Sequence, residues 1–214
     1  MNKQELILSY LKELFAEPKC ELSFKNNYEL VVAVVLSAQC TDRRVNMVTP
    51  KLFEKYSTPY LLANAKREDV IKIIHSLGFY NSKSKNIINL AKDLCERFNG
   101  QVPRNFDDLV SLSGVGRKTA NVVLSVAYNK QAIAVDTHVF RVSNRLGIKS
   151  KSPLECEKKL QKLFNKEDWS QLHYLLVLFG RYRCKAINPQ CEICKLQSIC
   201  EYYKSNNAAN IKKS

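Results

Sequence analysis

The feature that most restricts how this chain can fold is a set of four closely spaced cysteines near its end. They follow the pattern C-x6-C-x2-C-x5-C and are Cys184, Cys191, Cys194 and Cys200. Four thiolates this close together can surround one metal centre, and both tetrahedral zinc and a four-iron, four-sulfur cluster accept four cysteines. Structural zinc sites usually combine two short ligand pairs, whereas only the middle pair is short here. The spacing therefore favours iron–sulfur but leaves the metal open, and we expect the centre to hold the tail in shape rather than to react.

The rest of the chain has the composition and the periodicity of a helical globular protein. Of its 214 residues, 45% are hydrophobic and 25% are charged, which is ordinary for such a protein. Apolar side chains recur at helical spacing and predict an N-terminal helix, a buried helix over 28–39, a helix capped by Ser82 and ended by Asn99-Gly100, and further helices over 43–56, 67–77, 117–128, 138–146, 153–164 and 168–182. Because no alternating strand pattern occurs, the predicted fold class is all-α. The last ten residues are polar, and we expect them to fray.

The charge balance predicts a polyanionic partner. The chain has 34 Lys and Arg against 20 Asp and Glu, a net charge of +14. A basic surface of this size favours nucleic acid ahead of an anionic membrane, although a lysine-rich proteome would give the same count. No apolar stretch is long enough to span a membrane, and the N-terminus lacks a signal-peptide pattern. We therefore expect an intracellular protein, in which the eight cysteines do not form a disulfide framework.

The stretch LSGVGRKTAN, residues 112–121, contains two glycines followed by an Arg-Lys pair. A Walker phosphate loop and a dinucleotide fingerprint both fail here, because the glycines of those motifs are missing. A helix–hairpin–helix fits better, with a first helix over 106–112, a turn over 113–116 and a second helix from Arg117. Amides at the start of that second helix would bind a DNA phosphate without regard to base sequence. The alternative is an ordinary turn between helices with a solvated lysine.

Lys118 and Asp136 are the candidate reactive side chains. Lys118 lies in the first turn of the predicted helix beside Arg117, and both the helix dipole and this neighbour disfavour a charged ammonium. A neutral amine is a nucleophile that can form a Schiff base with an aldehydic carbon. Asp136 precedes a helical run and can equally be a helix N-cap. Their spacing of eighteen residues does not show that they are close in space.

Taken together, these motifs resemble endonuclease III, a base-excision DNA glycosylase and AP lyase. The resemblance rests on LSGVGRKTANVVL, VDTHVFRVSNRLG and the four-cysteine tail, with LSAQCTD and LGFYNSKSKNI in the same order, and it covers residues 5–202. It implies two α-helical domains with DNA bound between them. The first is a six-helix domain over 20–130, with the hairpin at 106–128. The second joins 1–19 to 131–214 and holds the iron–sulfur cluster.

The resemblance also implies roles for individual residues. Lys118 would be the Schiff-base nucleophile and Asp136 the essential carboxylate, and a 4Fe-4S cluster would be ligated by the four tail cysteines. Gln39 would fill the gap left by a flipped nucleotide, and Phe79 would be a wedge into the opposite strand, although a plain core Phe is a close alternative. The remaining expected DNA contacts are Gly114, Val115, Gly116, Arg117, His138, Arg141 and Lys185. The loop KAINPQ departs from the family in having a single basic residue, Lys185, where several are usual.

The implied activity is removal of oxidised pyrimidines, such as thymine glycol, from duplex DNA. The strand would then be cleaved 3′ to the abasic site by β-elimination. The implied partner is double-stranded DNA with a damaged pyrimidine or an abasic site, and the implied protein is a monomer in the cytoplasm, at the nucleoid, with no membrane partner. Two alternatives stay open. One is a monofunctional mismatch glycosylase, which typically lacks the lysine at position 118. The other is a non-catalytic DNA-binding iron–sulfur protein.

Overall fold

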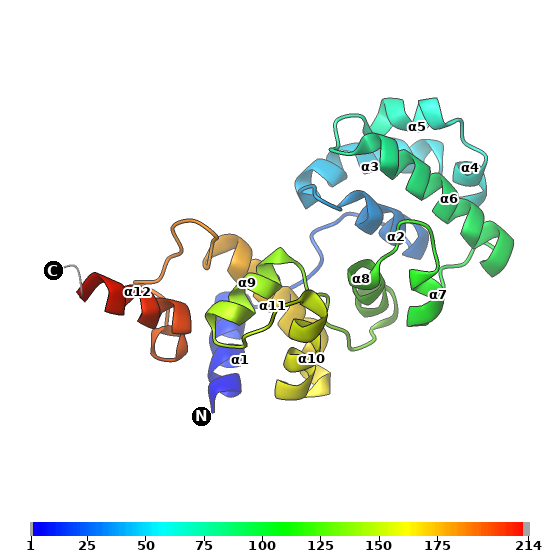
Figure 1. Ribbon diagram of the computed structural model, residues 1–214. Coiled ribbons are helices and arrows are strands. Elements are labelled where there is room, and N and C mark those ends of the chain that lie inside the picture. The colour runs from blue at the N-terminus through cyan, green and yellow to red at the C-terminus, as the bar shows by residue number, and fades with distance from the viewer. Residues whose placement is uncertain (1, 212–214) are drawn as a thin grey trace. The chain divides into compact units, whose positions relative to one another are not determined.

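The computed structural model describes residues 2–211, together with the side chains of residues 2–206. Every regular element within residues 2–211 is a helix, which confirms the all-α prediction (Figure 1). The chain divides into two compact units. The central unit is Cys20–Lys130, and the terminal unit combines Met1–Lys19 with Gln131–Ser214.

The central unit contains seven helices, all within described residues: α2 Asn27–Leu36, α3 Asp42–Lys55, α4 Pro59–Ala63, α5 Arg67–Ile74, α6 Tyr80–Phe98, α7 Phe106–Val110 and α8 Arg117–Tyr128. The sequence pattern predicted six helices here and missed the five-residue α4. The start of α4 could have been predicted from the sequence, because Thr58 caps the helix through its side-chain oxygen and Pro59 occupies the first turn. Five residues are too few to show helical periodicity.

Helix α2 is the centre of this unit. Every residue from Tyr28 to Leu36 is buried, and α2 packs against α3, α6 and α8. A helix that is apolar on all sides must be surrounded by other elements, so this sequence dictates the position of α2. The predicted range 28–39 is too long at its end, because the helix stops at Leu36 and Gln39 has left-handed backbone geometry (φ 53°).

Helix α6 also differs from expectation at its start and agrees at its end. Ser82 lies inside the helix rather than capping it, and Phe79 occupies the N-cap position. At the other end, Asn99 (φ 49°) and Gly100 (φ 74°) stop the helix as predicted, and the Gly100 N–H donates to the Leu94 carbonyl. The Asn-Gly pair succeeds as a signal because both residues tolerate positive φ.

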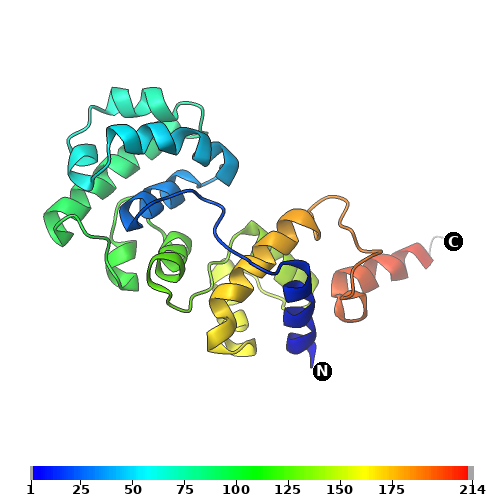
Figure 2. The same cartoon turned by 180° about the vertical axis from the view of Figure 1, so that it is seen from behind.

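The terminal unit contains α1 Lys3–Leu14, α9 Thr137–Arg145, α10 Pro153–Leu163, η1 Lys166–Asp168, α11 Trp169–Tyr182, η2 Gln197–Ile199 and α12 Glu201–Ile211. Helix α11 packs against both α1 and α9, as Figure 2 shows from behind. The approach to α9 is close at Gly180, where a Cβ atom would lie 2.8 Å from the Cβ of His138. A glycine here lets the two helices touch, which fixes the position of α9.

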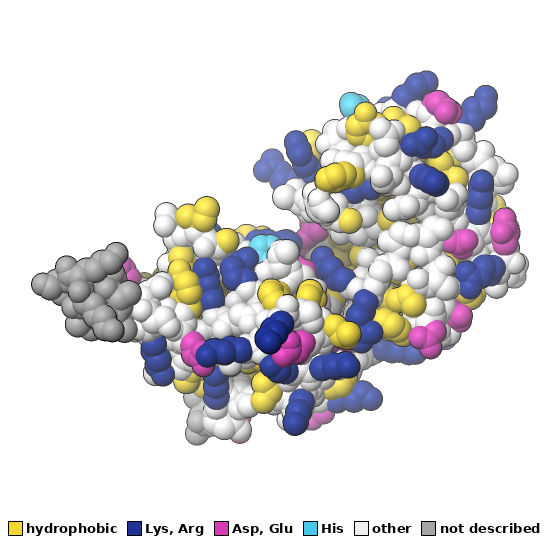
Figure 3. Space-filling view, in the orientation of Figure 1, with side chains coloured by type: hydrophobic (Ala, Val, Ile, Leu, Met, Phe, Trp, Pro, Cys, Tyr) yellow, Lys and Arg dark blue, Asp and Glu magenta, His cyan; other side chains and the backbone are white. Residues whose placement is uncertain are grey.

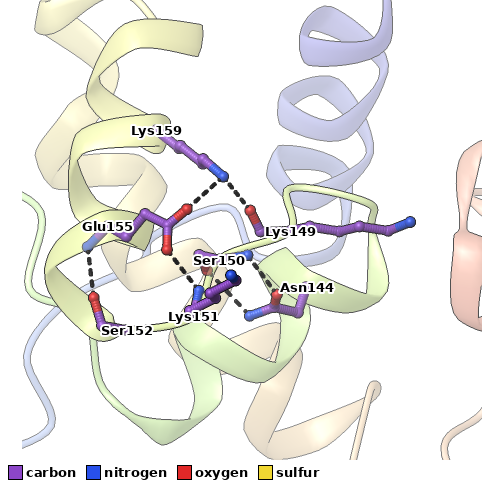
Figure 4. A network of polar contacts seen from close by, with 7 residues as sticks. All are labelled: Asn144, Lys149, Ser150, Lys151, Ser152, Glu155 and Lys159. Atoms are coloured by element: carbon purple, nitrogen blue, oxygen red, sulfur yellow. Dashed lines mark hydrogen bonds and ion pairs between the residues drawn. The ribbon is translucent and has the colours of Figure 1, made fainter.

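Polar contacts hold the loop between α9 and α10 (Figure 4). The Asn144 side chain accepts from the Ser150 N–H at 2.8 Å. The Glu155 carboxylate accepts from the Lys151 N–H at 2.7 Å, and Lys159 forms an ion pair with the same carboxylate. Side chains of both helices therefore bind the backbone of this loop, which attaches the end of α9 to the start of α10.

The backbone of the tail is helical as far as Ile211 in α12. The expected fraying of the last ten residues stays a prediction for 205–211, and 212–214 lie outside the described residues. Within the described chain, no helix combines the length and the apolar character that crossing a membrane requires.

Candidate catalytic, DNA-binding and metal sites

The hairpin between α7 and α8 is held against α6. The Ser113 N–H donates to the Asp93 carboxylate at 2.8 Å. Gly114 has φ +77°, and a Cβ atom there would lie 2.9 Å from the Cβ of Asn86. Only glycine satisfies both the positive φ and the close approach. The turn therefore has one conformation, set by its contacts with a long helix.

The start of α8 leaves backbone amides open. Gly116 occupies the N-cap position, and no side chain caps this helix end. Uncapped amides at a helix N-terminus bind anions, and the helix dipole adds to the attraction. Gly116 and Arg117 are exposed, and the Arg117 guanidinium lies 4.8 Å from the centre of the Phe106 ring. Val115 instead buries its side chain and donates its N–H to the Leu112 carbonyl, so it stabilises the turn, and its DNA contact stays a prediction.

Lys118 is exposed in the first turn of α8. Within the central unit its amine has no hydrogen bond and no ion pair, unlike several other lysines of the chain. An exposed amine beside open backbone amides can meet an electrophilic carbon whose neighbouring phosphate binds those amides. This arrangement suits a nucleophile acting on a nucleic-acid backbone.

Gln39 and Phe79 share an unusual backbone conformation. Among the described residues, five other than glycine have positive φ. Three are asparagines, which tolerate this region, and the other two are Gln39 (φ 53°) and Phe79 (φ 58°). Both are exposed, Phe79 to 64% of its surface. Such strain costs about 1–3 kcal/mol and is concentrated at functional positions, which supports a role for these two side chains beyond packing.

Asp136 caps α9 in the terminal unit. Its Oδ1 accepts from the Val139 N–H at 2.8 Å, so the structural role considered from the sequence is present. The side chain is only half-buried, and a carboxylate that accepts one hydrogen bond retains further acceptor sites. Capping and chemistry are therefore compatible at this residue.

His138 and Arg141 are part of the contact between α9 and α11. The Arg141 guanidinium donates to the Gly180 carbonyl at 2.7 Å and to the Cys184 carbonyl at 3.1 Å. It also lies 3.3 Å from Nδ1 of His138, whose pKa is lowered by burial. Arg141 thus ties the end of α11 to α9, and its DNA contact stays a prediction.

The four tail cysteines line one pocket. Burial, followed by the charge of the neighbouring thiols Cys184 and Cys200, raises the pKa of Cys191. Burial is also the main cause of the raised pKa of Cys194. Thiols in such surroundings bind metal by exchanging their protons for it.

The donor set of this pocket fits a four-iron cluster. In such a cluster each cysteine ligates a different iron, and the pocket offers four cysteine side chains. The identity of the cofactor stays a prediction from the spacing of these cysteines.

Sequence reasoning missed Arg145, which organises this pocket. Its guanidinium donates to the Cys184 sulfur at 3.4 Å, and to the carbonyls of Lys185 at 2.6 Å and Ala186 at 3.0 Å. It also lies 4.0 Å from the centre of the Tyr202 ring. The sequence could have indicated Arg145 through its position four residues after Arg141, because this spacing places both guanidinium groups on one side of α9. Lys185 itself is exposed, and Figure 3 shows Lys and Arg side chains spread over the visible face.

Comparison with known proteins identifies relatives over nearly the whole chain. The family model described as HhH-GPD superfamily base excision DNA repair protein matches residues 32–166. Endonuclease III of Bacillus subtilis (strain 168) is 52% identical over 202 residues, covering 94% of this chain and 92% of that protein. Endonuclease III of Rickettsia felis is 45% identical over 207 residues, covering 94% and 97%.

Solved structures give the same result. A trapped endonuclease III–DNA covalent intermediate, in an estranged-adenine complex, matches with a TM-score of 0.92 and 48% identity, covering 97% of this chain and 99% of that one. A thermostable thymine-DNA glycosylase has the same fold, with a TM-score of 0.85 at 23% identity over 95% of this chain and 97% of that one. The resemblance drawn from the sequence motifs is confirmed, and the chain belongs to the endonuclease III family within the HhH-GPD superfamily of base excision DNA repair proteins.

Proposed function

We propose that the chain removes oxidised pyrimidines, thymine glycol among them, from duplex DNA and then cleaves the strand 3′ to the abasic site through a Schiff base on Lys118. The proposal rests on the exposed Lys118 amine in the first turn of α8, beside a helix N-terminus with no side-chain cap. A relative of 48% identity has been trapped as a covalent intermediate with DNA. A covalent intermediate needs a nucleophile on the protein, and Lys118 is suited to that role.

DNA would bind first through its backbone. Amides of the hairpin and of the first turn of α8 would hold one phosphate near Lys118. A damaged base must leave the stack before its sugar can be attacked. Gln39 and Phe79, exposed and held in left-handed geometry, are suited to occupy the space that the base vacates. The net charge of +14 would add sequence-independent attraction.

The chemistry divides into two stages. Lys118 Nζ attacks C1′ of the sugar, a C–N bond forms, and the glycosidic bond breaks as the base leaves with its electron pair and takes up a proton. The Asp136 carboxylate stabilises positive charge on the sugar during this step. The sugar ring then opens to an imine, which acidifies the C2′ protons. Loss of one such proton breaks the C3′–O bond, and water hydrolyses the imine to release Lys118.

The four tail cysteines would ligate a 4Fe-4S cluster. Once bound, the cluster would link Cys184 to Cys200 and so hold the loop that contains Lys185. Purified protein should contain about four iron and about four sulfide atoms per chain. We further propose that the enzyme acts as a monomer on lesion-containing duplex at the bacterial nucleoid.

The decisive experiment is borohydride trapping on a duplex with a single thymine glycol. Wild type should give a covalent protein–DNA adduct, and Lys118→Ala should give none. Arg117→Ala is the matched control, because it removes a charge from the same helical turn but keeps the amine, so it should still form adduct. Base release without trapping would favour the monofunctional alternative. Duplex binding with neither trapping nor release, for abasic DNA as well, would favour the non-catalytic alternative.

A further inference from the structure

Lys83 is a buried lysine with an unusual partner. Only 4% of its surface is exposed, although lysine is among the residues least often buried. Its ammonium donates a hydrogen bond to the sulfur of Cys40 at 3.0 Å. These two residues come from different elements, Cys40 from the turn after α2 and Lys83 from the first turns of α6.

A buried ammonium needs an anionic or strongly accepting partner to offset its desolvation. The hydrogen bond to Cys40 is the polar contact of this amine within the described chain, and no carboxylate forms an ion pair with it there. A neutral thiol is a weak acceptor. The buried Lys83 amine is therefore directed at the Cys40 sulfur, the hydrogen-bond acceptor that it reaches within the described chain.

Cys40 is accessible from solvent as well as from Lys83. Its side chain is half-buried, and Ala38 and Gln39, which precede it, are both exposed. Cys40 is followed by Thr41, whose side chain caps α3. Cys40 is therefore partly open to solvent, and its sulfur is in contact with a buried ammonium. Reactive cysteines are found in such partly exposed, electropositive surroundings.

We propose that Cys40, with Lys83 as its activating partner, is a modification site for hydroperoxides. The Cys40 thiolate attacks one oxygen of hydrogen peroxide, an S–O bond forms and the O–O bond breaks. Sulfur loses two electrons and the peroxide gains them. The leaving hydroxide takes a proton from the Lys83 ammonium and becomes water, leaving a sulfenic acid beside a neutral amine. A thiol reductant reverses the modification.

The consequence for DNA repair rests on the proposed function. Cys40 adjoins Gln39, which we place in the gap left by the flipped nucleotide. The hydrogen bond between Cys40 and Lys83 attaches this turn to α6. An added oxygen lengthens that contact and displaces the turn, so oxidation lowers affinity for lesion-containing duplex. The site would thus link peroxide exposure to DNA binding.

The test treats the full-length protein with a small excess of hydrogen peroxide in the presence of dimedone, which traps sulfenic acids, and maps the adducts by peptide mass spectrometry. Cys95 is the internal control, because it is equally half-buried and its pKa is raised by burial. Wild type should label at Cys40 at least about tenfold faster than at Cys95, the factor expected of a hydrogen bond to a charged group. Lys83→Met, unbranched and of similar volume, should remove this difference. Lys83→Arg should not restore the full difference, because arginine keeps the charge but does not give up a proton to the leaving hydroxide.

Equal labelling of Cys40 and Cys95 in wild type overturns the proposal, as does rapid Cys40 labelling in Lys83→Met. A second arm measures duplex binding before and after peroxide. Wild type should lose affinity and regain it with dithiothreitol, whereas the affinity of Cys40→Ala, whatever its untreated value, should not change on adding peroxide. An untreated protein that binds no duplex would count against the proposed function, while the dimedone result would still decide the modification site.

Discussion

Asp136 caps α9 and is proposed to act in the chemistry, and one pair of substitutions separates these two roles. Its Oδ1 caps α9 through the Val139 N–H at 2.8 Å, and the same carboxylate is proposed to stabilise charge on the sugar. Asp136→Asn keeps an oxygen acceptor in the same place, and asparagine caps helices about as well as aspartate. It removes the negative charge, which near a helix N-terminus contributes only about 0.3–1 kcal/mol. Asp136→Ala removes both cap and charge.

The two variants should therefore differ in stability and agree in activity. Asp136→Ala should lose about 1–2 kcal/mol of unfolding free energy, from the lost cap and the lost charge–dipole attraction. Asp136→Asn should lose under about 1 kcal/mol. Both should release thymine glycol about 10²–10⁴-fold more slowly, the usual range for a group that assists proton transfer or charge stabilisation.

Urea unfolding and single-turnover base release measure the two quantities on the same protein samples. Base release by Asp136→Asn within about threefold of wild type, a difference under about 1 kcal/mol in barrier height, would refute the chemical role and leave Asp136 as a cap alone. If Asp136→Asn were as unstable as Asp136→Ala, the cap geometry described here would be wrong.

Four other perturbations test the remaining features of the chain. Gly114→Ala should cost about 1–3 kcal/mol in urea unfolding because of its positive φ and the contact with α6, whereas Gly116→Ala, with nothing within 4 Å of its Cβ, should cost under about 1 kcal/mol. Phe79→Gly should raise stability or leave it unchanged by relieving left-handed strain, yet weaken binding to lesion-containing duplex in a fluorescence titration. The pKa of His138 is lowered in the folded protein, so at a pH just below the ordinary value of 6.5 the unfolded chain binds more protons than the folded one. The unfolding free energy should therefore fall as the pH drops below 6.5. This dependence of the unfolding free energy on pH should be weaker in His138→Gln. Cys194→Ser should lower the iron content and the unfolding free energy of the protein, and an unchanged iron content would exclude Cys194 as a ligand.

The sequence predicted helices well where long apolar periodicity decided them. Helix α8, Arg117–Tyr128, agrees with its predicted range at both ends. The helix bounds that were predicted wrongly occur where the local backbone geometry overrides the intrinsic propensity of the residue. Ser82 has the chemistry of an N-cap, but the left-handed Phe79 starts α6 one turn earlier. No propensity scale assigns φ 58° to a phenylalanine, because tertiary contacts must impose it.

In the candidate site, too, the sequence motifs predicted the reactive residues but not the contacts that position their neighbours. Motifs indicated Lys118, Asp136 and the cysteines, because reactive residue types stand out in a helical chain. They could not show that Arg141 donates to the Gly180 carbonyl, or that Arg145 contacts the loop after Cys184. Such contacts depend on how closely α9 packs against α11. That close packing requires a residue without a Cβ atom at Gly180. Likewise, no motif pairs Cys40 with Lys83.

The contacts of Arg145 bear on how a cluster would be assembled into this chain. One guanidinium bonds the Lys185 and Ala186 carbonyls and lies over the Tyr202 ring of α12, so a single side chain of α9 contacts both the loop after Cys184 and the last helix. Contacts of this kind restrict the loop independently of any metal and so reduce the conformational freedom that its cysteines would lose on binding one. Substitution of Arg145 should therefore lower the iron content of the protein, although arginine is not a ligand of the proposed cluster.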